Sequence, residues 1–156
     1  MPRQASVYYE GMFQKDDIVI PVGAKKKEDL LFSTNHITKI CFEFMNNDSI
    51  LCNEVEIKSQ SYRNEDVIVI KSFNSNFLEV GLIQGILYKE NNIYFLIYKY
   101  TAMRSLSLNY FETIDTDTNL HFVRYDNVCD YKPLVKYGTI EKFKFCLKHH
   151  ITVNVP

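Results

Sequence analysis

Polar and hydrophobic residues alternate along much of the chain after residue 36, which is the pattern of strands with one buried face. Over residues 37–45, the side chains of Ile40, Phe42 and Phe44 fall on one face. The next four residues are rich in Asn and Asp and predict a turn, after which the alternation resumes over residues 50–58. We therefore predict a β-hairpin over residues 37–58.

Three later segments give the strongest strand predictions. Residues 66–71 form a short apolar run. Residues 80–88 contain Gly81 and Gly85, and a glycine inside a strand indicates a bulge or the close approach of another segment. Residues 93–100 are apolar on both faces, so we expect this strand to be central in its sheet and joined to the preceding strand by a short hairpin loop.

Turn residues and weaker alternation predict the remaining segments. They are an irregular arm (1–36), a polar loop (59–66), a short helix or crossover (103–111), a turn (115–119), a strand (120–125), a loop around one extended piece (126–138) and a final strand (139–155). About seven to nine short strands with at most one or two short helices favour a mainly β fold, either an antiparallel β-barrel or a sandwich. We expect a single domain over residues 1–156, with a β-barrel core over residues 66–155.

Composition agrees with this fold class and limits the function. The chain has 11 Tyr, 11 Phe and only 5 Gly, and aromatic residues are favoured in strands. Its formal net charge of -1 provides no overall field to attract nucleic acid or an anionic membrane. The first residues lack the apolar stretch of a signal peptide, and four cysteines without such a signal predict buried thiols. We therefore expect an intracellular protein.

One group of residues has the side-chain types that bind zinc. Cys146 is followed by His149 and His150, and Cys129 lies upstream. Structural zinc sites usually combine two close pairs of ligands, and only one close pair is present here. Strand alternation would also point Cys146 and His149 to opposite faces. We expect no metal and no cofactor.

A second pattern is typical of metal-dependent nucleases. Glu56 and Lys58 form an acid-x-Lys pair on a predicted strand, and Asp48 is near them in the sequence. Two carboxylates can hold a divalent cation while a lysine stabilises an attacking water, but the same residues also fit a solvated strand face. The chain has neither a Gly-x-Ser-x-Gly elbow nor a Gly-rich phosphate loop. We expect that the protein is not an enzyme, with the nuclease as the alternative.

A third pattern is basic. Lys142, Lys144 and Lys148 fall on one face of the predicted last strand, with tyrosines interleaved upstream. Lysines beside aromatic residues can bind single-stranded nucleic acid, and lysines also protect an edge strand against aggregation. The near-neutral net charge favours the protective role, so nucleic-acid binding by these three lysines is an alternative hypothesis.

Several segments together resemble a known family. Residues 66–71 resemble the opening strand of the BAH (bromo-adjacent homology) domain, and residues 80–87 followed by 93–100 resemble its central hairpin. Residues 121–126 through 142–147 resemble its late strands, in the same order. The stretch 80–100 is also similar to uncharacterised domains in proteins encoded by animal mobile elements. The family's Arg-Pro pair and cage tryptophans have no counterpart in this chain. The resemblance implies a nuclear interaction module, linked to chromatin or to a mobile element and without catalysis.

We therefore expect a non-catalytic module that binds a protein or peptide partner in the nucleus. Aromatic side chains would supply the contact area, and one residue of each charge would fix the polarity of the interface. The residues expected on this face flank the central hairpin and the late strand: Tyr98, Tyr100, Arg104, Tyr125 and Asp126. A viral host-interaction protein is a further alternative, because the richness in Asn, Ile, Lys and Tyr suits an AT-rich genome.

Overall fold

In the part of the chain that the structure describes, the fold is a pair of antiparallel sheets with one α-helix. The computed structural model describes residues 18–19, 24–105 and 110–147, which contain twelve strands, one α-helix and two short 3₁₀ helices. Every strand pair runs antiparallel. The prediction of a mainly β, antiparallel protein is confirmed, although several strands are much longer than expected.

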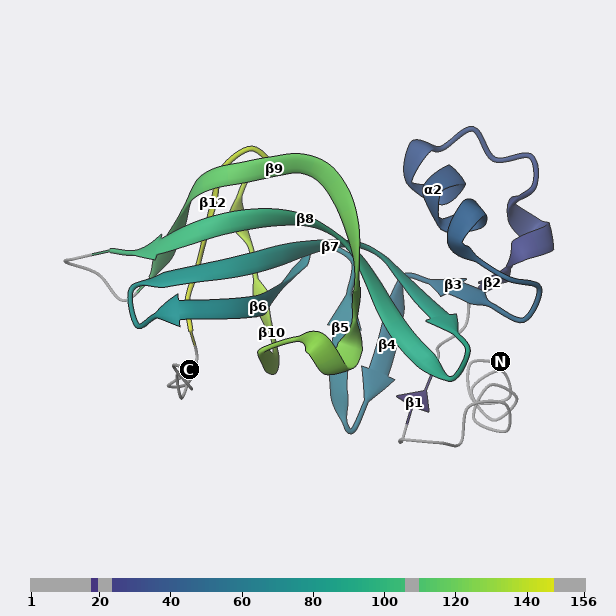
Figure 1. Cartoon of the computed structure of the whole chain (residues 1–156), viewed down its shortest axis with the longest axis horizontal. Helices are drawn as coiled ribbons and strands as arrows, with labels where there is room; N and C mark the ends of the chain where they lie inside the picture. Colours follow the sequence, from purple (N-terminus) through teal and green to yellow (C-terminus); the bar gives the residue numbers. More distant parts are fainter. Residues whose placement is uncertain (1–17, 20–23, 106–109, 148–156) are drawn as a thin grey trace.

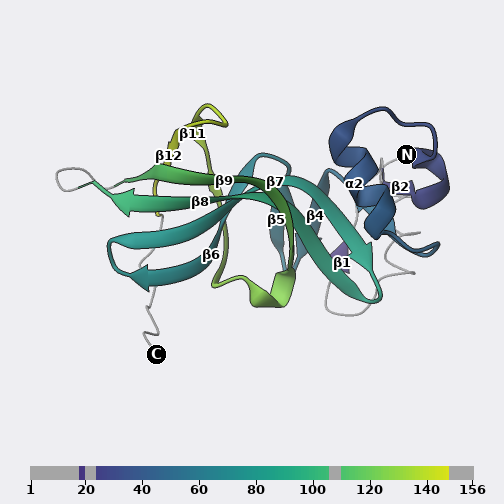
Figure 2. The same ribbon diagram turned by 45° about the horizontal axis from the view of Figure 1, so that its top comes forward.

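Four long strands lie side by side and form the centre of the larger sheet (Figure 1). They are β6 (Asp66–Asn74), β7 (Phe77–Lys89), β8 (Asn92–Arg104) and β9 (Phe111–Arg124). Beyond β9 the sheet continues through β12 (Phe143–Phe145) to β11 (Tyr137–Gly138), and beyond β6 it ends at β10 (Asp130–Val135) (Figure 2). Within the described residues the sheet is therefore open and does not close into a barrel, and the arrangement is sandwich-like. The predicted central position of residues 93–100 is confirmed.

Smaller strands cover one end of this sheet. β3 (Ile50–Cys52) pairs with β7 and in turn with β2 (Lys25–Lys26), while a separate three-stranded sheet has the order β1 (Ile18–Val19), β4 (Glu54–Ile57), β5 (Gln60–Arg63). In Figure 1 the helix α2 (His36–Phe44) and strands β4 and β5 lie on opposite sides of the same end of β7 and β8. At this end, the β7–β8 hairpin therefore lies between α2 on one side and strands β4 and β5 on the other.

Three hydrophobic clusters lie along the β7–β8 hairpin. The β12 core contains Val80, Leu82, Tyr100, Phe143 and Phe145, and lies toward the end of the hairpin that is far from α2. The β4–β5 core contains Val55, Ile57, Tyr62, Phe95 and Ile97. The helix core contains Cys41, Met45, Leu87 and Leu96. The last two clusters lie on opposite faces of β7 and β8, which explains why residues 93–100 are apolar on both faces.

Two glycines in β7 permit this double-sided packing. A Cβ atom on Gly81 would lie 2.6 Å from Cδ1 of Ile97, so a side chain there would collide with the β4–β5 core. Gly85 follows a shift in the β7–β8 register after Ile83, and a Cβ there would lie 3.4 Å from Sγ of Cys41 on the helix. The predicted bulge and close approach within residues 80–88 are both confirmed.

Residues 36–44 form the helix α2, so the strand predicted over 37–45 and the hairpin predicted over 37–58 are wrong. The side chain of Asn35 caps the helix by accepting a hydrogen bond from the backbone N–H of Thr38 at 3.0 Å. At the other end, Nζ of Lys89 donates to the carbonyl oxygen of Phe44 at 2.7 Å, where a cation also favours the helix dipole. Cap contacts and packing on the sheet therefore outweigh the two-residue alternation of the sequence.

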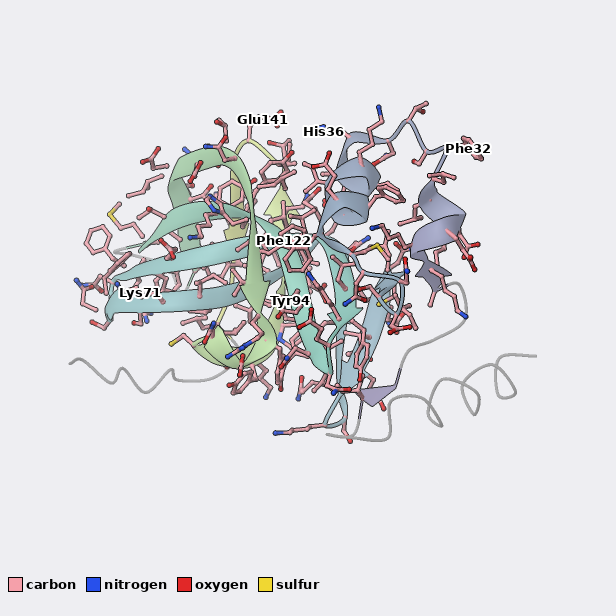
Figure 3. The ribbon with its side chains drawn as sticks, turned by 45° about the vertical axis from the view of Figure 1, so that its right-hand side comes forward. Phe32, His36, Lys71, Tyr94, Phe122 and Glu141 are labelled. Atoms are coloured by element: carbon pink, nitrogen blue, oxygen red, sulfur yellow. The ribbon has the colours of Figure 1, made fainter. Side chains whose placement is uncertain are left out.

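Aromatic rings fix the C-terminal end of α2 on the sheet. The ring of Phe44 stacks on Phe122 with centroids 4.0 Å apart and meets the ring of Tyr94 edge-on at 5.1 Å. Tyr94 and Phe122 come from the neighbouring strands β8 and β9 and are labelled in Figure 3. This contact places the helix over a face of the sheet that would otherwise be exposed to water.

Two predicted loops and turns are wrong because they contain strands, and a third segment holds the one extended piece predicted for it and a second strand besides. The polar segment 59–66 contains β5, in which only Tyr62 points into the core, so no alternation is visible. The predicted turn at 115–119 is a bulge inside β9, where the partner of Tyr98 is Leu120 but the partner of Lys99 is Asp117. The segment 126–138 contains both β10 and β11. Turn-forming residues here interrupt the strand register rather than end a strand.

Two predictions fall partly on residues that the structure does not describe. Of the segment 103–111, Met103 and Arg104 end β8 and Phe111 begins β9, while residues 106–109 lie outside the described residues. Of the final strand predicted over 139–155, β12 is the strand that is described, and residues 148–156 lie outside. Among the described residues, no helix has the length and apolar character needed to cross a membrane.

Candidate functional site

Tyr98 and Tyr100 lie on β8 and pack against the β12 core. Only 3% of Tyr100 is exposed, its ring meets Phe143 edge-on at 4.7 Å, and its hydroxyl donates to the carbonyl oxygen of Ile140 at 2.6 Å. Burial raises the pKa of Tyr100 to about 12, so the hydroxyl stays protonated at neutral pH. Tyr100 therefore stabilises the fold and is not available to a partner.

Arg104 is the last residue of β8 and forms hydrogen bonds with the turn of the β6–β7 hairpin. Its backbone N–H donates to the carbonyl oxygen of Asn76, and its Nε donates to that of Ser75 at 3.1 Å. The guanidinium also lies over the ring of Phe111, 4.8 Å from the centroid. These contacts occupy Arg104 at the turn between β6 and β7.

Tyr125 and Asp126 lie at the opposite end of the sheet, in the 3₁₀ helix η3 (Tyr125–Asn127) that follows β9. Tyr125 packs against the β4–β5 core, a different cluster from the one that holds Tyr98 and Tyr100. The prediction that the five residues share one face is therefore wrong. β8 is thirteen residues long, and its two ends serve different cores.

A pocket of about 250 Å³ opens beside Tyr125 and Asp126. Its apolar lining comes from Ile18, Ile57 and Ile93, which belong to the β4–β5 core and are themselves buried. These three residues come from three separate strands, β1, β4 and β8. An apolar side chain entering this pocket would be taken out of water, which is favourable in proportion to the apolar area covered.

One wall of the pocket is a pair of tyrosines. The rings of Tyr125 and Tyr131 stack with centroids 4.7 Å apart, and both residues line the pocket. The hydroxyl of Tyr62 donates to the carbonyl oxygen of Tyr131, and the ring of Tyr62 meets Tyr125 edge-on at 5.9 Å. Burial raises the pKa of Tyr125 above its usual value, so the hydroxyl of Tyr125 stays protonated at neutral pH. Tyr131 remains 43% exposed.

Two tight turns form the opposite rim. Lys58 and Ser59 connect β4 to β5, and Glu90 and Asn91 connect β7 to β8. All four have positive φ, between 49° and 69°, as the central residues of type I′ hairpin turns require. Asn91 also accepts a hydrogen bond from the hydroxyl of Tyr88 at 3.0 Å. The rim is therefore held in a defined conformation before any ligand arrives.

The charged groups at the mouth are few and balanced. Lys58 and Asp126 line the pocket with the amides Asn91 and Asn92. The carboxylate of Asp126 is paired with Nε of Arg124 at 2.6 Å. An apolar floor, an aromatic wall and a thin polar rim together fit the side chain of one large residue from a partner, as at the anchor positions of protein interfaces.

A larger groove of about 370 Å³ lies over the β12 core end of the sheet and has a different character. It is lined by Glu79, Lys99, Asp115 and Asp117, among other polar residues. Nε2 of His121 lies 2.8 Å from Oδ2 of Asp117, and the N–H of Asn119 donates to the other carboxylate oxygen of Asp117 at 2.9 Å. A ligand would have to compete with these internal bonds, so size alone does not make this groove the better site.

Two lysines of the predicted basic strip are paired with a single carboxylate. Nζ of Lys142 lies 3.5 Å from Oε1 of Glu112, and Nζ of Lys144 lies 3.8 Å from Oε2 of the same carboxylate. Lys144 also lies over the ring of Tyr110, 4.9 Å from the centroid. Lys148 lies outside the described residues. Two of the three lysines thus share one acidic partner, which weakens the case for a phosphate-binding surface.

The residues of the nuclease hypothesis are distributed over separate elements. Glu56 lies on the exposed face of β4, Lys58 lies in the following turn, and Asp48 lies in the loop before β3. Within the part of the chain that the structure describes, no group of three or more His, Cys, Asp or Glu side chains could hold a metal ion. The prediction of buried thiols is confirmed for Cys41 and Cys52 and is wrong for Cys129 and Cys146, which are exposed. His149 and His150 lie outside the described residues.

Sequence reasoning identified two of the pocket residues, Tyr125 and Asp126, and missed the others. Tyr131 is one of several tyrosines spaced along the late segment, and Asn91 belongs to the predicted hairpin loop. Both residues can be picked out in the sequence, but no pattern in it indicates that they line the same pocket as Ile57. Comparison of the chain with protein-family models, with curated proteins and with solved structures found no match.

Proposed function

We propose that this protein is a non-catalytic interaction module that binds a protein or peptide partner through the pocket beside Tyr125 and Tyr131. The observation that carries the proposal is the composition of that pocket, which combines buried isoleucines with a half-exposed, stacked tyrosine pair. Tyrosine is enriched at the energetic centres of protein interfaces because it offers a large, rigid contact area.

The expected strength follows from the size of the pocket. Burying one large apolar side chain contributes about 1.5–3 kcal/mol, which corresponds to roughly a ten- to hundredfold change in affinity. Ligand ordering would offset part of this gain, and the preformed turns of the rim reduce the ordering required of the protein. A single anchor residue is thus sufficient for weak, reversible recognition, and neighbouring contacts must supply the rest.

The cellular part of the proposal rests on the sequence resemblance to BAH domains. That resemblance supports a nuclear partner linked to chromatin or to a mobile element. The residues that carry it lie mostly in β6 to β9 and β12, and three of them, Ile93, Tyr125 and Asp126, also line the pocket. Whichever partner is bound, the pocket predicts that it contributes a large apolar or aromatic side chain.

A peptide-display selection tests the proposal directly. Random peptides would be selected on the wild-type protein and their dissociation constants measured by fluorescence polarisation. Tyr131→Ala should weaken the selected peptides about tenfold or more, because it removes the exposed half of the aromatic wall. Tyr137→Ala is the matched control, since Tyr137 is 62% exposed on β11 and is not part of the pocket lining. Equal effects of both substitutions would contradict the proposal.

A further inference from the structure

Two neighbouring apolar side chains are exposed in the turn between the 3₁₀ helix η2 (Lys27–Leu30) and α2. Leu31 is 59% exposed and Phe32 is 90% exposed, the largest exposed fraction among the large hydrophobic residues that the structure describes. Figure 3 shows Phe32 at the outer edge of the molecule, on the α2 side. Removing apolar surface from water is favourable, so this pair, which we call the Phe32 knob, would be stabilised by contact with a partner.

The turn that carries the Phe32 knob is fixed at both ends. Before the knob, Leu30 is buried in the helix core. After it, the N–H of Ser33 donates to the carbonyl oxygen of Leu30 at 3.1 Å, and the N–H of Asn35 donates to Oγ of Ser33 at 3.2 Å. Asn35 is in turn the N-cap of α2. Because the backbone is already ordered, little conformational freedom is lost when Phe32 enters a partner.

The Phe32 knob and the pocket beside Tyr125 and Tyr131 are complementary surfaces of the same chain. The pocket has an apolar floor and a volume of about 250 Å³, and Phe32 offers the kind of side chain that fits it. The pocket floor belongs to the β4–β5 core, and α2 lies on the opposite side of the hairpin end from β4 and β5 (Figure 1). The fixed turn therefore holds Phe32 away from the pocket of its own chain, and a second copy is needed to bring the two surfaces together.

We infer that the pocket receives the Phe32 knob of a second copy of this chain. The inference rests on the proposed function, since it names the partner of the same pocket. The knob and the pocket are different surfaces, so the contact is heterologous, and each copy can both insert a knob and receive one. Rising protein concentration should therefore add further copies beyond the dimer.

The charges of the chain permit this self-association. The formal net charge of -1 produces little repulsion between copies. Exposed residues of both signs lie near the knob, at Lys26 and Glu28, and residues of both signs line the pocket, at Lys58 and Asp126. Neither surface therefore presents a single sign of charge that would repel the other.

Sedimentation velocity of the purified chain tests the inference, over concentrations from about 1 μM to about 1 mM, the range of weak complexes. The average mass of the wild-type protein should rise with concentration. Phe32→Asp should raise the dissociation constant at least tenfold without affecting the fold, because Phe32 is 90% exposed. Phe73→Asp is the matched control: Phe73 is another exposed phenylalanine, at 45%, and lies on β6 away from the knob and the pocket lining. It should associate as the wild type does.

A mixture of two variants provides a second test and guards against misfolding. Phe32→Asp keeps an intact pocket, and Tyr131→Ala keeps an intact knob. Each variant alone should remain largely monomeric at concentrations at which the wild type associates. An equimolar mixture should form a 1:1 dimer and nothing larger, because the dimer has one working contact and no second knob-and-pocket pair to extend it.

The outcomes separate this inference from the proposed function. A monomeric wild type up to about 1 mM, association of Phe32→Asp equal to that of the wild type, or a mixture that does not dimerise would each overturn the inference. Display-selected peptides that remain sensitive to Tyr131→Ala would still support the pocket in those cases. If the selected peptides are insensitive to Tyr131→Ala, the proposed function itself fails.

Discussion

Tyrosines lie at both ends of the β7–β8 hairpin, but their surroundings differ between the two ends. At one end, Tyr100 is buried in the β12 core and its hydroxyl bonds to Ile140 within the chain. At the other end, Tyr125 and Tyr131 stack at the mouth of a pocket and Tyr131 remains half exposed. A tyrosine near a strand is therefore accessible to a partner only where no further strand covers it.

The cavities at the two ends teach the same lesson. The larger groove, at the β12 core end, is lined by charged groups such as Asp117, whose carboxylate is already paired with His121. The smaller pocket has a buried apolar floor and a rim of tight turns. Binding energy comes from removing apolar surface from water, so the smaller pocket is the better candidate.

The largest expected effect comes from removing a core ring at either end. Phe95→Ala and Phe143→Ala should each lower the free energy of unfolding by about 3–5 kcal/mol, measured by urea denaturation. Phe95 packs beside Tyr62 and Tyr125, with centroids 5.3 and 6.4 Å away. Its loss should also weaken peptide binding to the protein that remains folded, because Phe95 packs beside the pocket residue Tyr125, whereas loss of Phe143 should not. If both variants lose peptide affinity equally, the two ends are not independent.

The next effect concerns the glycine that allows the two-sided packing. Gly81→Ala should destabilise the protein by about 1–3 kcal/mol, because its Cβ would lie 2.6 Å from Cδ1 of Ile97. Ile97→Val removes that carbon atom. The double variant should therefore be less destabilised than the sum of the two single changes, as a thermal or urea unfolding series would show. Strict additivity would mean that this contact does not explain the glycine.

A smaller effect, of opposite sign, is expected at the rim of the pocket. Glu90 has φ of 51°, a conformation that costs a side chain about 1 kcal/mol relative to glycine. Glu90→Gly should raise the free energy of unfolding by up to that amount. Ser75→Gly, in the turn between β6 and β7 where φ is not positive, should be neutral or slightly destabilising. Stabilisation by both changes would remove the argument for a strained rim.

The smallest effect is a pH dependence at the β12 core end. Burial raises the pKa of Tyr100 from about 10 to about 12 in the folded state, so the folded protein holds this proton more tightly than the unfolded chain. The resulting stabilisation is present below about pH 10 and is lost as the pH rises toward 12. Tyr100→Phe should therefore make the fall in stability between pH 10 and 12 less steep, while lowering stability at neutral pH by about 1 kcal/mol through the lost hydrogen bond. An unchanged alkaline slope would contradict this assignment.

The strands at the centre of the sheet could be predicted from the sequence because their patterns have one interpretation. Residues 93–100 are apolar on both faces and form the middle of β8. Residues 37–45 could not be assigned correctly, because Ile40 and Phe44 fit both a two-residue alternation and a helical spacing of four. Contacts with residues distant in the sequence favour the helix, namely the hydrogen bond from Lys89 to the carbonyl oxygen of Phe44 and the stacking of Phe122 on Phe44.

The candidate site was only half predictable for a similar reason. Tyr125 and Asp126 were identified because they flank the late strand and combine an aromatic contact surface with a charge. The pocket floor is assembled from β1, β4 and β8, and no local pattern reveals that these segments meet. Tyr98 and Tyr100 were assigned to the same face because the sequence does not reveal which side of β8 is covered by β12.

The most direct test of a partner site at this end of the molecule is hydrogen–deuterium exchange with a peptide from the display selection. We predict that the bound peptide slows exchange at residues 57–58, 91–93 and 125–131, around the pocket. Exchange at Lys99 and residues 115–117, around the larger groove, should not change. Protection at the groove without protection at the pocket would contradict the account and move the binding site to the other end of the hairpin.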